Sequence, residues 1–217
     1  MYEPESDREP GSDEFLEEGT VGGSPQRRGR LIFVPNAVTA ANIVVGFLSM
    51  LAAADGRFDL AVYLLFVCIM LDMADGRLAR ALKVTSKFGQ EMDSLSDTVS
   101  FCVAPAFLVQ RAVLQPLDGF GVGVAVSFIL AGVYRLARFN LTSDEHVKAR
   151  KTLGAPTPIG AGYLMALVLI RDQVPVPAAA ALVVIMGMLM VSRIQLPELH
   201  GRNLVTGMLL IDRKSVV

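Results

Sequence analysis

Four aspartates place the strongest constraint on how this chain can fold. They lie at the inner ends of two strongly apolar segments, and they are Asp72, Asp75, Asp93 and Asp97. On a helix, at about 100° per residue, Asp72 and Asp75 share one narrow face with Gly76. Asp93 and Asp97 share one face of the following segment in the same way. The spacing predicts two helices that each offer a pair of acids.

Converging carboxylates in a poorly hydrated site repel one another strongly, so the pattern requires cations. Hard oxygen ligands on fixed helix faces suit Mg²⁺ or Mn²⁺, and we expect two such ions. Gly76 removes a side chain from the face that the metals would occupy, so a bulky ligand can approach the backbone there. The expected ligand is a diphosphate. The alternative is four acids that are solvated separately at a membrane surface.

The apolar residues are unevenly distributed along the chain. Of the 217 residues, 53% are hydrophobic, and they are concentrated between Val38 and Val191. A polytopic membrane protein explains this distribution better than a soluble core does. We therefore expect an all-α fold, a polytopic membrane helical bundle with about six transmembrane helices. The six apolar segments are residues 37–54, 58–78, 95–113, 120–137, 159–170 and 176–191.

The cations indicate how these helices are oriented in the lipid bilayer. Arg57, Arg111 and Arg171 would lie on one side of the membrane. The other side would hold the remaining clusters: Arg27, Arg28, Arg30, Arg77, Arg80, Lys83, Lys87, Arg135, Arg138, Lys148, Arg150, Lys151, Arg193, Arg202, Arg213 and Lys214. By the positive-inside rule, both termini and the aspartates face the cytoplasm. We expect a multi-pass protein of the cell inner membrane with its active site on the cytoplasmic side.

The two ends of the chain differ in composition from the region between them. Residues 1–30 are acidic and rich in Gly, Ser and Pro, which predicts a disordered tail without a signal peptide. We place the transmembrane domain at residues 31–195. Residues 196–217 are expected to form a C-terminal tail or an interfacial helix.

The first apolar segment opens with several polar residues. Pro35 occupies a position that the start of a helix tolerates, and Asn36 or Thr39 is expected to cap that start or to form a hydrogen bond nearby. Asn42 lies deeper in the segment, where a carboxamide requires a polar partner or a ligand.

Two arginines follow the fourth apolar segment. Arg135 and Arg138 are spaced i, i+3, so they share a helix face and can hold a phosphate or a carboxylate. The alternative is that both extend to the membrane surface and obey the positive-inside rule.

The run from Asp72 to Asp97 reads D-x2-D-G-x2-A-R-x8-G-x3-D-x3-D, and it resembles the signature of the CDP-alcohol phosphatidyltransferase family. Three further stretches resemble its phosphatidylserine synthase branch. They are Pro35-Asn36-x2-Thr39-x2-Asn42-x3-Gly46, the run from Arg135 to Asn140, and Gly154-x-Pro156-x-Pro158. That branch commonly has Leu where this chain has Ala155.

The resemblance implies a role for each matching residue. Asp72, Asp75 and Asp93 would hold the metals, with Asp97 completing the shell and acting as the general base. The CDP-lipid would be bound by the residues Gly76, Ala79, Arg80, Thr39, Pro35, Asn36 and Ser86. The acceptor would be bound by Arg135, Arg138 and Asn42.

The implied substrates are CDP-diacylglycerol and L-serine, with phosphatidylserine and CMP as products, and the implied assembly is a homodimer in a lipid bilayer. No nucleic acid partner is expected. Glycerol 3-phosphate or inositol phosphate remains open as the acceptor. A divalent cation transporter, which also requires carboxylates inside the membrane, is the alternative from a different functional class.

Overall fold

The computed structural model describes residues 25–82, 87–143 and 154–192, and all regular structure in these ranges is helical. The first two helices, α1 (Pro25–Ala54) and α2 (Phe58–Leu82), form a hairpin. A continuous helical run follows, in the order α3 (Lys87–Asp97), the π-helical segment η2 (Thr98–Val103), α4 (Ala104–Val109) and the π-helical segment η3 (Gln110–Leu114). The last long helices are α5 (Asp118–Ser143), α6 (Thr157–Leu169) and α7 (Val176–Val191).

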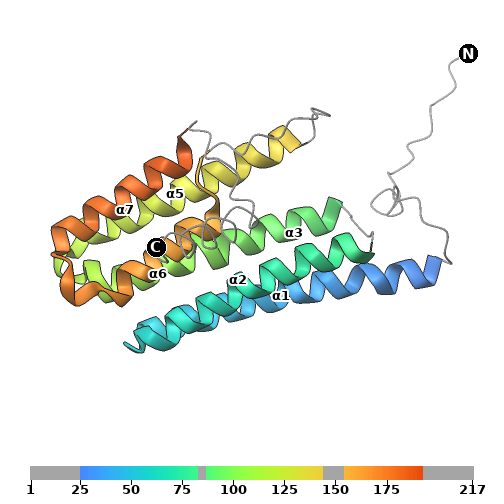
Figure 1. The fold of residues 1–217 in the computed structure, drawn as a ribbon, viewed down its shortest axis with the longest axis horizontal. Helices are drawn as coiled ribbons and strands as arrows, with labels where there is room; N and C mark the ends of the chain where they lie inside the picture. Colours follow the sequence, from blue (N-terminus) through green and yellow to red (C-terminus); the bar gives the residue numbers. More distant parts are fainter. Residues whose placement is uncertain (1–24, 83–86, 144–153, 193–217) are drawn as a thin grey trace, which may run out of the picture.

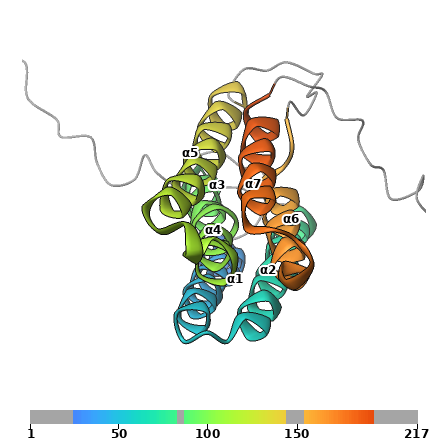
Figure 2. The same ribbon diagram turned by 90° about the vertical axis from the view of Figure 1, so that its left-hand side faces the viewer.

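The axes of the helices are roughly aligned with one another, and the helices pack in layers. Figures 1 and 2 show α1 beside α2 at one side of the bundle, and α5 beside α7 at the other. The α3–α4 run and α6 lie between these two pairs and contact both. The core between the layers is apolar, and its fully buried side chains include Leu65, Phe101, Leu108, Phe128 and Leu164. The predicted all-α class is therefore confirmed.

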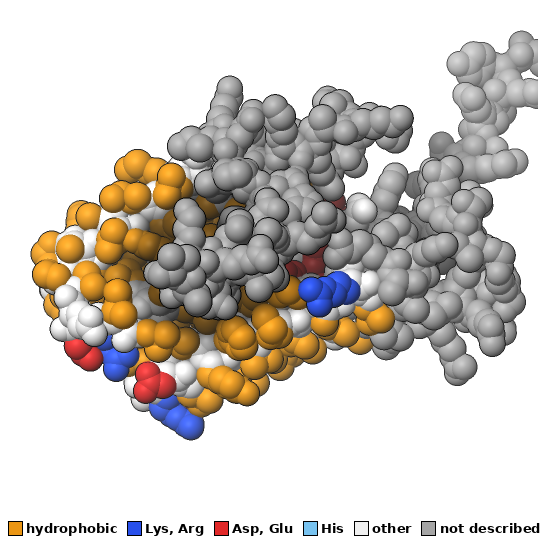
Figure 3. Space-filling view, in the orientation of Figure 1, with side chains coloured by type: hydrophobic (Ala, Val, Ile, Leu, Met, Phe, Trp, Pro, Cys, Tyr) orange, Lys and Arg blue, Asp and Glu red, His pale blue; other side chains and the backbone are white. Residues whose placement is uncertain are grey.

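Large apolar side chains also cover the outside of the described bundle. Tyr63, Leu130 and Met188 are each more than 60% exposed. Figure 3 shows a broad hydrophobic surface, with charged side chains gathered at its edges. Two helical stretches, Asn36–Ala54 and Phe88–Leu141, are long and apolar enough to cross a membrane, and Thr157–Leu169 and Val176–Val191 are shorter apolar helices. An apolar exterior of this kind is typical of a protein whose helices contact lipid.

The turn between α1 and α2 is stabilised by its backbone. The N–H groups of Gly56 and Arg57 donate to the carbonyls of Ala53 and Ala52, at 3.1 and 2.8 Å. Gly56 has a φ of +76°, which glycine adopts at little cost at the end of a helix. The tight turn brings α2 back along α1, so that Asp72 and Asp75 lie beside the part of α1 that contains Thr39.

The start of α1 differs from the prediction. The helix begins at Pro25, so Pro35, Asn36 and Thr39 are all inside it and neither Asn36 nor Thr39 caps its start. Thr39 instead forms a side-chain hydrogen bond, which was the other role expected of it. The apolar residues after Arg30 extend the helical pattern backwards, and tertiary packing can carry a helix through an unfavourable proline. The predicted boundary at residue 30 falls within α1, and the division into domains stays a prediction.

Candidate active site

The four aspartates come together where α2 ends and α3 begins. Carboxylate oxygens of Asp72, Asp75 and Asp93, one from each residue, all lie within 4.8 Å of one another. Asp97 lies within electrostatic range of Asp72, Asp75 and Asp93. Two acids from α2 thus meet two acids from α3, because each pair occupies one face of its helix, as the spacing predicted.

This group of acids fits a hard divalent cation. Two oxygens bound to one Mg²⁺ at about 2.1 Å are at most about 4.2 Å apart, so small side-chain rotations bring oxygens within 4.8 Å onto one ion. In addition, Asp97 Oδ1 is buried and has no hydrogen-bond partner among the described residues. A buried carboxylate oxygen without a donor is rare, and a cation is one way to satisfy it. Asp72, Asp75 and Asp93 therefore form a group that can hold a divalent metal ion.

Gly76 leaves open space beside the acids. It is exposed, and a Cβ built on it would meet no atom of the described residues within 4 Å. The predicted opening toward a bulky ligand is consistent with this position. The side chains of Pro35, Ala79 and Arg80, and the whole of Ser86, lie outside the described residues.

Helix α1 supplies the third side of the site. Thr39 is buried, and its Oγ1 donates a hydrogen bond of 3.2 Å to Asp75 Oδ2. Asn36 is half-buried three residues earlier on the same helix. Asn42 is 1% exposed, and its Oδ1 has no hydrogen-bond partner within the described parts of the chain. Thr39 of α1 therefore faces the acids, and Asn42 is buried inside the bundle rather than exposed to lipid.

Two serines that the sequence analysis did not single out bind α3 and η2 to α1. Ser96 Oγ donates to the carbonyl of Thr39, and Ser100 Oγ donates to the carbonyl of Asn42, both at 3.3 Å. Serines one helical turn apart thus bond to carbonyls about one turn apart on the neighbouring helix. Hydroxyl side chains within an apolar run were the signal that could have revealed them, because such groups hydrogen-bond between helices in a membrane.

Ser94 and Asn140 form a second contact that sequence reasoning missed. Asn140 Nδ2 donates to Ser94 Oγ at 3.0 Å, which joins α3 to the end of α5. Ser94 is the residue after Asp93, so this contact holds α5 next to the acids.

The two arginines of α5 have different surroundings. Arg135 is buried, lies within electrostatic range of Asp97, and has an Nε atom without a partner among the described residues. Arg138 donates from its guanidinium to the carbonyls of Val191 and Ser192, at 2.9 and 3.4 Å, where α7 ends. It also lies over the ring of Tyr134, 5.9 Å from the ring centroid. The structure thus brings Arg135 to the acids, whereas Arg138 binds the end of α7.

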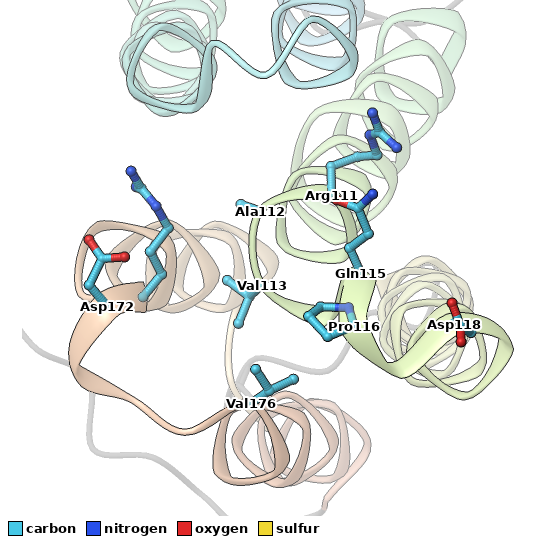
Figure 4. A pocket seen from close by; sticks show the side chains of 9 residues that line it. Arg111, Ala112, Val113, Gln115, Pro116, Asp118, Asp172 and Val176 are labelled. Atoms are coloured by element: carbon cyan, nitrogen blue, oxygen red, sulfur yellow. The ribbon is translucent and has the colours of Figure 1, made fainter.

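A cavity of about 570 Å³ lies at the opposite end of the bundle (Figure 4). It is lined by the polar residues Arg111, Gln115, Asp118, Arg171 and Asp172, and by apolar neighbours. Arg111 points toward the α1–α2 turn, where it donates to the carbonyl of Ala54 at 3.2 Å, and Arg171 donates to the carbonyl of Val168. The four aspartates at the meeting of α2 and α3 do not border this cavity. Its arginines stabilise helix ends, and we assign it no chemistry.

Comparison with known proteins identifies the family. The sequence profile of the CDP-alcohol phosphatidyltransferase family matches residues 32–196. The chain belongs to the CDP-alcohol phosphatidyltransferase family. The matched region contains all four acids and every helix from α2 to α7. The acids that meet between α2 and α3 are therefore the acids of a phosphatidyltransferase.

Several characterised members of this family are similar over most of the chain. The CDP-diacylglycerol--serine O-phosphatidyltransferase of Helicobacter pylori is 35% identical over 177 residues, which cover 77% of this chain and 73% of that protein. The protein of the same name from Bacillus subtilis is 32% identical over 135 residues, covering 62% and 75%. Archaetidylserine synthase of Methanothermobacter thermautotrophicus is 31% identical over 172 residues, covering 78% and 72%. The predicted family and its phosphatidylserine synthase branch are confirmed.

Proposed function

We propose that this protein is an integral-membrane enzyme that transfers the phosphatidyl group of CDP-diacylglycerol to the hydroxyl of L-serine. The products would be phosphatidylserine and CMP. The observation that carries the proposal is the meeting of Asp72, Asp75, Asp93 and Asp97 beside open space at Gly76, in a member of this family. The names of the similar proteins support serine as the acceptor.

In the proposed reaction, the serine hydroxyl oxygen forms a bond to the lipid-side phosphorus of CDP-diacylglycerol. The bond from that phosphorus to the oxygen of CMP breaks, and CMP leaves with the electron pair. The serine hydroxyl has to lose its proton as it attacks. Asp97 is the proposed general base, and its buried Oδ1 has no competing hydrogen bond within the described part of the chain.

Asp72, Asp75 and Asp93, completed by Asp97, would hold two Mg²⁺ or Mn²⁺ ions. When bound, these ions would neutralise the diphosphate and the charge that accumulates on the departing CMP. The protein contributes the rigid positions of the acids, since α2 and α3 both pack against α1.

The CDP part of the lipid would lie against the face of α2 that continues from the acids. Gly76 exposes its backbone there, and Ala79 and Arg80 follow along the same helix. Thr39 borders the acids from the side of α1, where Asn36 and Pro35 would also contact the CDP part, and Ser86 belongs to the connection between the two acid pairs. These contacts to the CDP part are proposals.

The acceptor would enter from the side of α5. A serine carboxylate requires a cation, and Arg135 is buried near Asp97, whereas Arg138 is engaged at the end of α7. We therefore favour Arg135 as the partner of the carboxylate. The unpartnered Oδ1 of Asn42 is a candidate acceptor of a hydrogen bond from the serine ammonium group.

We further propose how the protein lies in its membrane. The six predicted apolar segments are helical throughout except at Ile170, which supports about six spans in the cell inner membrane. The acids share one end of the bundle with Arg77, Arg135 and Arg138, which supports a cytoplasmic active site with both termini on the same side. The resemblance supports a homodimer.

A direct test uses membranes that contain the protein, CDP-diacylglycerol and one labelled alcohol at a time. We expect label in lipid with L-serine, and release of an equal amount of CMP. Incorporation of glycerol 3-phosphate or inositol phosphate in place of serine would contradict the acceptor but not the chemistry. If the protein transferred no phosphatidyl group but carried metal ions into liposomes that lack CDP-lipid, the results would favour a divalent cation transporter instead.

A further inference from the structure

Thr39 connects all three helices around the acids. Its hydroxyl donates to Asp75 Oδ2 on α2 at 3.2 Å, and its backbone carbonyl accepts a hydrogen bond from Ser96 on α3 at 3.3 Å. Thr39, Asp75 and Ser96 are exposed by 5%, 5% and 1%, so water does not compete for these bonds. Ser96 lies between Asp93 and Asp97 in the sequence. One residue of α1 thus contacts α2 at an acid and α3 between two acids.

We infer that Thr39 is a positioning residue, whose hydroxyl orients the Asp75 carboxylate toward the metal site that it shares with Asp72 and Asp93. The inference rests on the proposed function, because that function requires the metal site. It differs from the role that the family resemblance implies for Thr39, which is contact with the CDP part of the substrate. The basis is the observed hydrogen bond to a candidate metal ligand.

The physical reason lies in the two oxygens of a carboxylate. A free aspartate can rotate about χ2 and present either oxygen or neither to a metal. A hydrogen bond to Oδ2 fixes that rotation, and a hydroxyl donor also favours the ionised carboxylate, which is the form that binds metal. Groups that hold a ligand in this way typically change metal affinity by 10–100-fold when they are removed. The bond from Ser96 holds the Thr39 backbone at a fixed distance from α3.

The test uses the full chain, purified and placed in lipid nanodiscs, and measures Mn²⁺ binding by the loss of the free Mn²⁺ signal in electron paramagnetic resonance. Thr39→Val removes the donor at nearly constant volume, and we expect Mn²⁺ to bind roughly 10–100-fold more weakly. Thr39→Ser keeps the donor and is expected to bind Mn²⁺ as the original protein does. Thr39→Ala should show the same loss of Mn²⁺ affinity. Because alanine is favourable in a helix, this variant replaces Thr39→Val if the valine variant does not fold.

Ser49→Ala is the matched control. Ser49 is also a fully buried hydroxyl of α1, but it donates to the carbonyl of Ala61 at 2.9 Å, toward the other end of the helix. Its removal should lower thermal stability and leave Mn²⁺ affinity unchanged.

Unchanged Mn²⁺ affinity in Thr39→Val and Thr39→Ala would overturn the inference. A rise in KM for CDP-diacylglycerol without a change in Mn²⁺ binding would overturn it too, in favour of contact with the nucleotide. If the original protein itself bound no Mn²⁺, the metal site and the proposed function would fail together. That outcome is distinguishable from failure at Thr39 alone.

Discussion

Gly46 of α1 lies directly against Ser100 of the π-helical segment η2. A Cβ built on Gly46 would be 2.9 Å from Ser100 Oγ and 3.3 Å from Ser100 Cα. Because η2 begins at the residue after Asp97, this contact sets how closely α1 approaches the acids. A π-helical segment at such a place is common near functional sites. The glycine is required here for the close approach of two helices.

Gly46→Ala is therefore expected to destabilise the fold by about 1–3 kcal/mol, the usual cost of overpacking a core. Thermal unfolding in detergent measures the effect. Since the nearest atom is Ser100 Oγ, the double variant Gly46→Ala/Ser100→Ala should recover part of the loss. Gly123→Ala in α5 is the control, because a Cβ there meets no described atom within 4 Å. Equal stability of Gly46→Ala and Gly123→Ala would contradict the packing argument.

Gly76→Leu should leave the fold intact and impair binding of the CDP-lipid. The space beside Gly76 is open within the described structure, so a larger side chain costs no packing there, but it would occupy the proposed approach of the diphosphate. We expect KM for CDP-diacylglycerol to rise by about tenfold or more, equivalent to about 1.4 kcal/mol. Steady-state kinetics and a melting curve measure the two effects. A normal KM in a folded variant would place the substrate elsewhere.

Asp93→Asn should weaken metal binding and transfer together. The change removes one charge from the group of carboxylate oxygens within 4.8 Å of one another. We expect a higher half-saturating concentration of Mg²⁺ or Mn²⁺ and a large loss of turnover, with the helical content unchanged. Chelation should abolish transfer by the original protein, and added metal should restore it. Asp172→Asn, an exposed acid at the opposite end of the bundle, is the control. Full turnover by Asp93→Asn would refute the proposed site.

Arg135→Met and Arg138→Met should have different effects, although the two residues share a helix face. Loss of a hydrogen-bonded charge typically costs about 1.5–3 kcal/mol, so Arg135→Met should raise KM for serine by roughly 10–100-fold. Arg138→Met should mainly lower the melting temperature, because Arg138 binds the carbonyls where α7 ends. An unchanged KM for serine in Arg135→Met would remove Arg135 from the acceptor site.

The all-α fold could be predicted because its signal is local, whereas the number of membrane spans stays a prediction. Apolar runs long enough to form helices are visible in the sequence, and the structure is helical throughout all six of them except at Ile170. The predicted start of α1 was too late. Asn36 and Thr39 resemble residues that cap the start of a helix, but the helix begins earlier, at Pro25. The hydrogen bonds made by Ser96 and Ser94 were missed, because a serine in the sequence does not reveal its partner.

By itself, the sequence determined which residues share a helix face, and therefore that Asp72 pairs with Asp75 and Asp93 with Asp97. That information is contained in the helical period. Only the tertiary structure decided which side chains of other helices reach those acids. Thr39 meets Asp75 across 36 residues, and Arg135 is buried within electrostatic range of Asp97, whereas Arg138 donates to a carbonyl at the end of α7. The rotation and approach of neighbouring helices fix such contacts, and these depend on the packing of the whole bundle rather than on any short stretch of sequence.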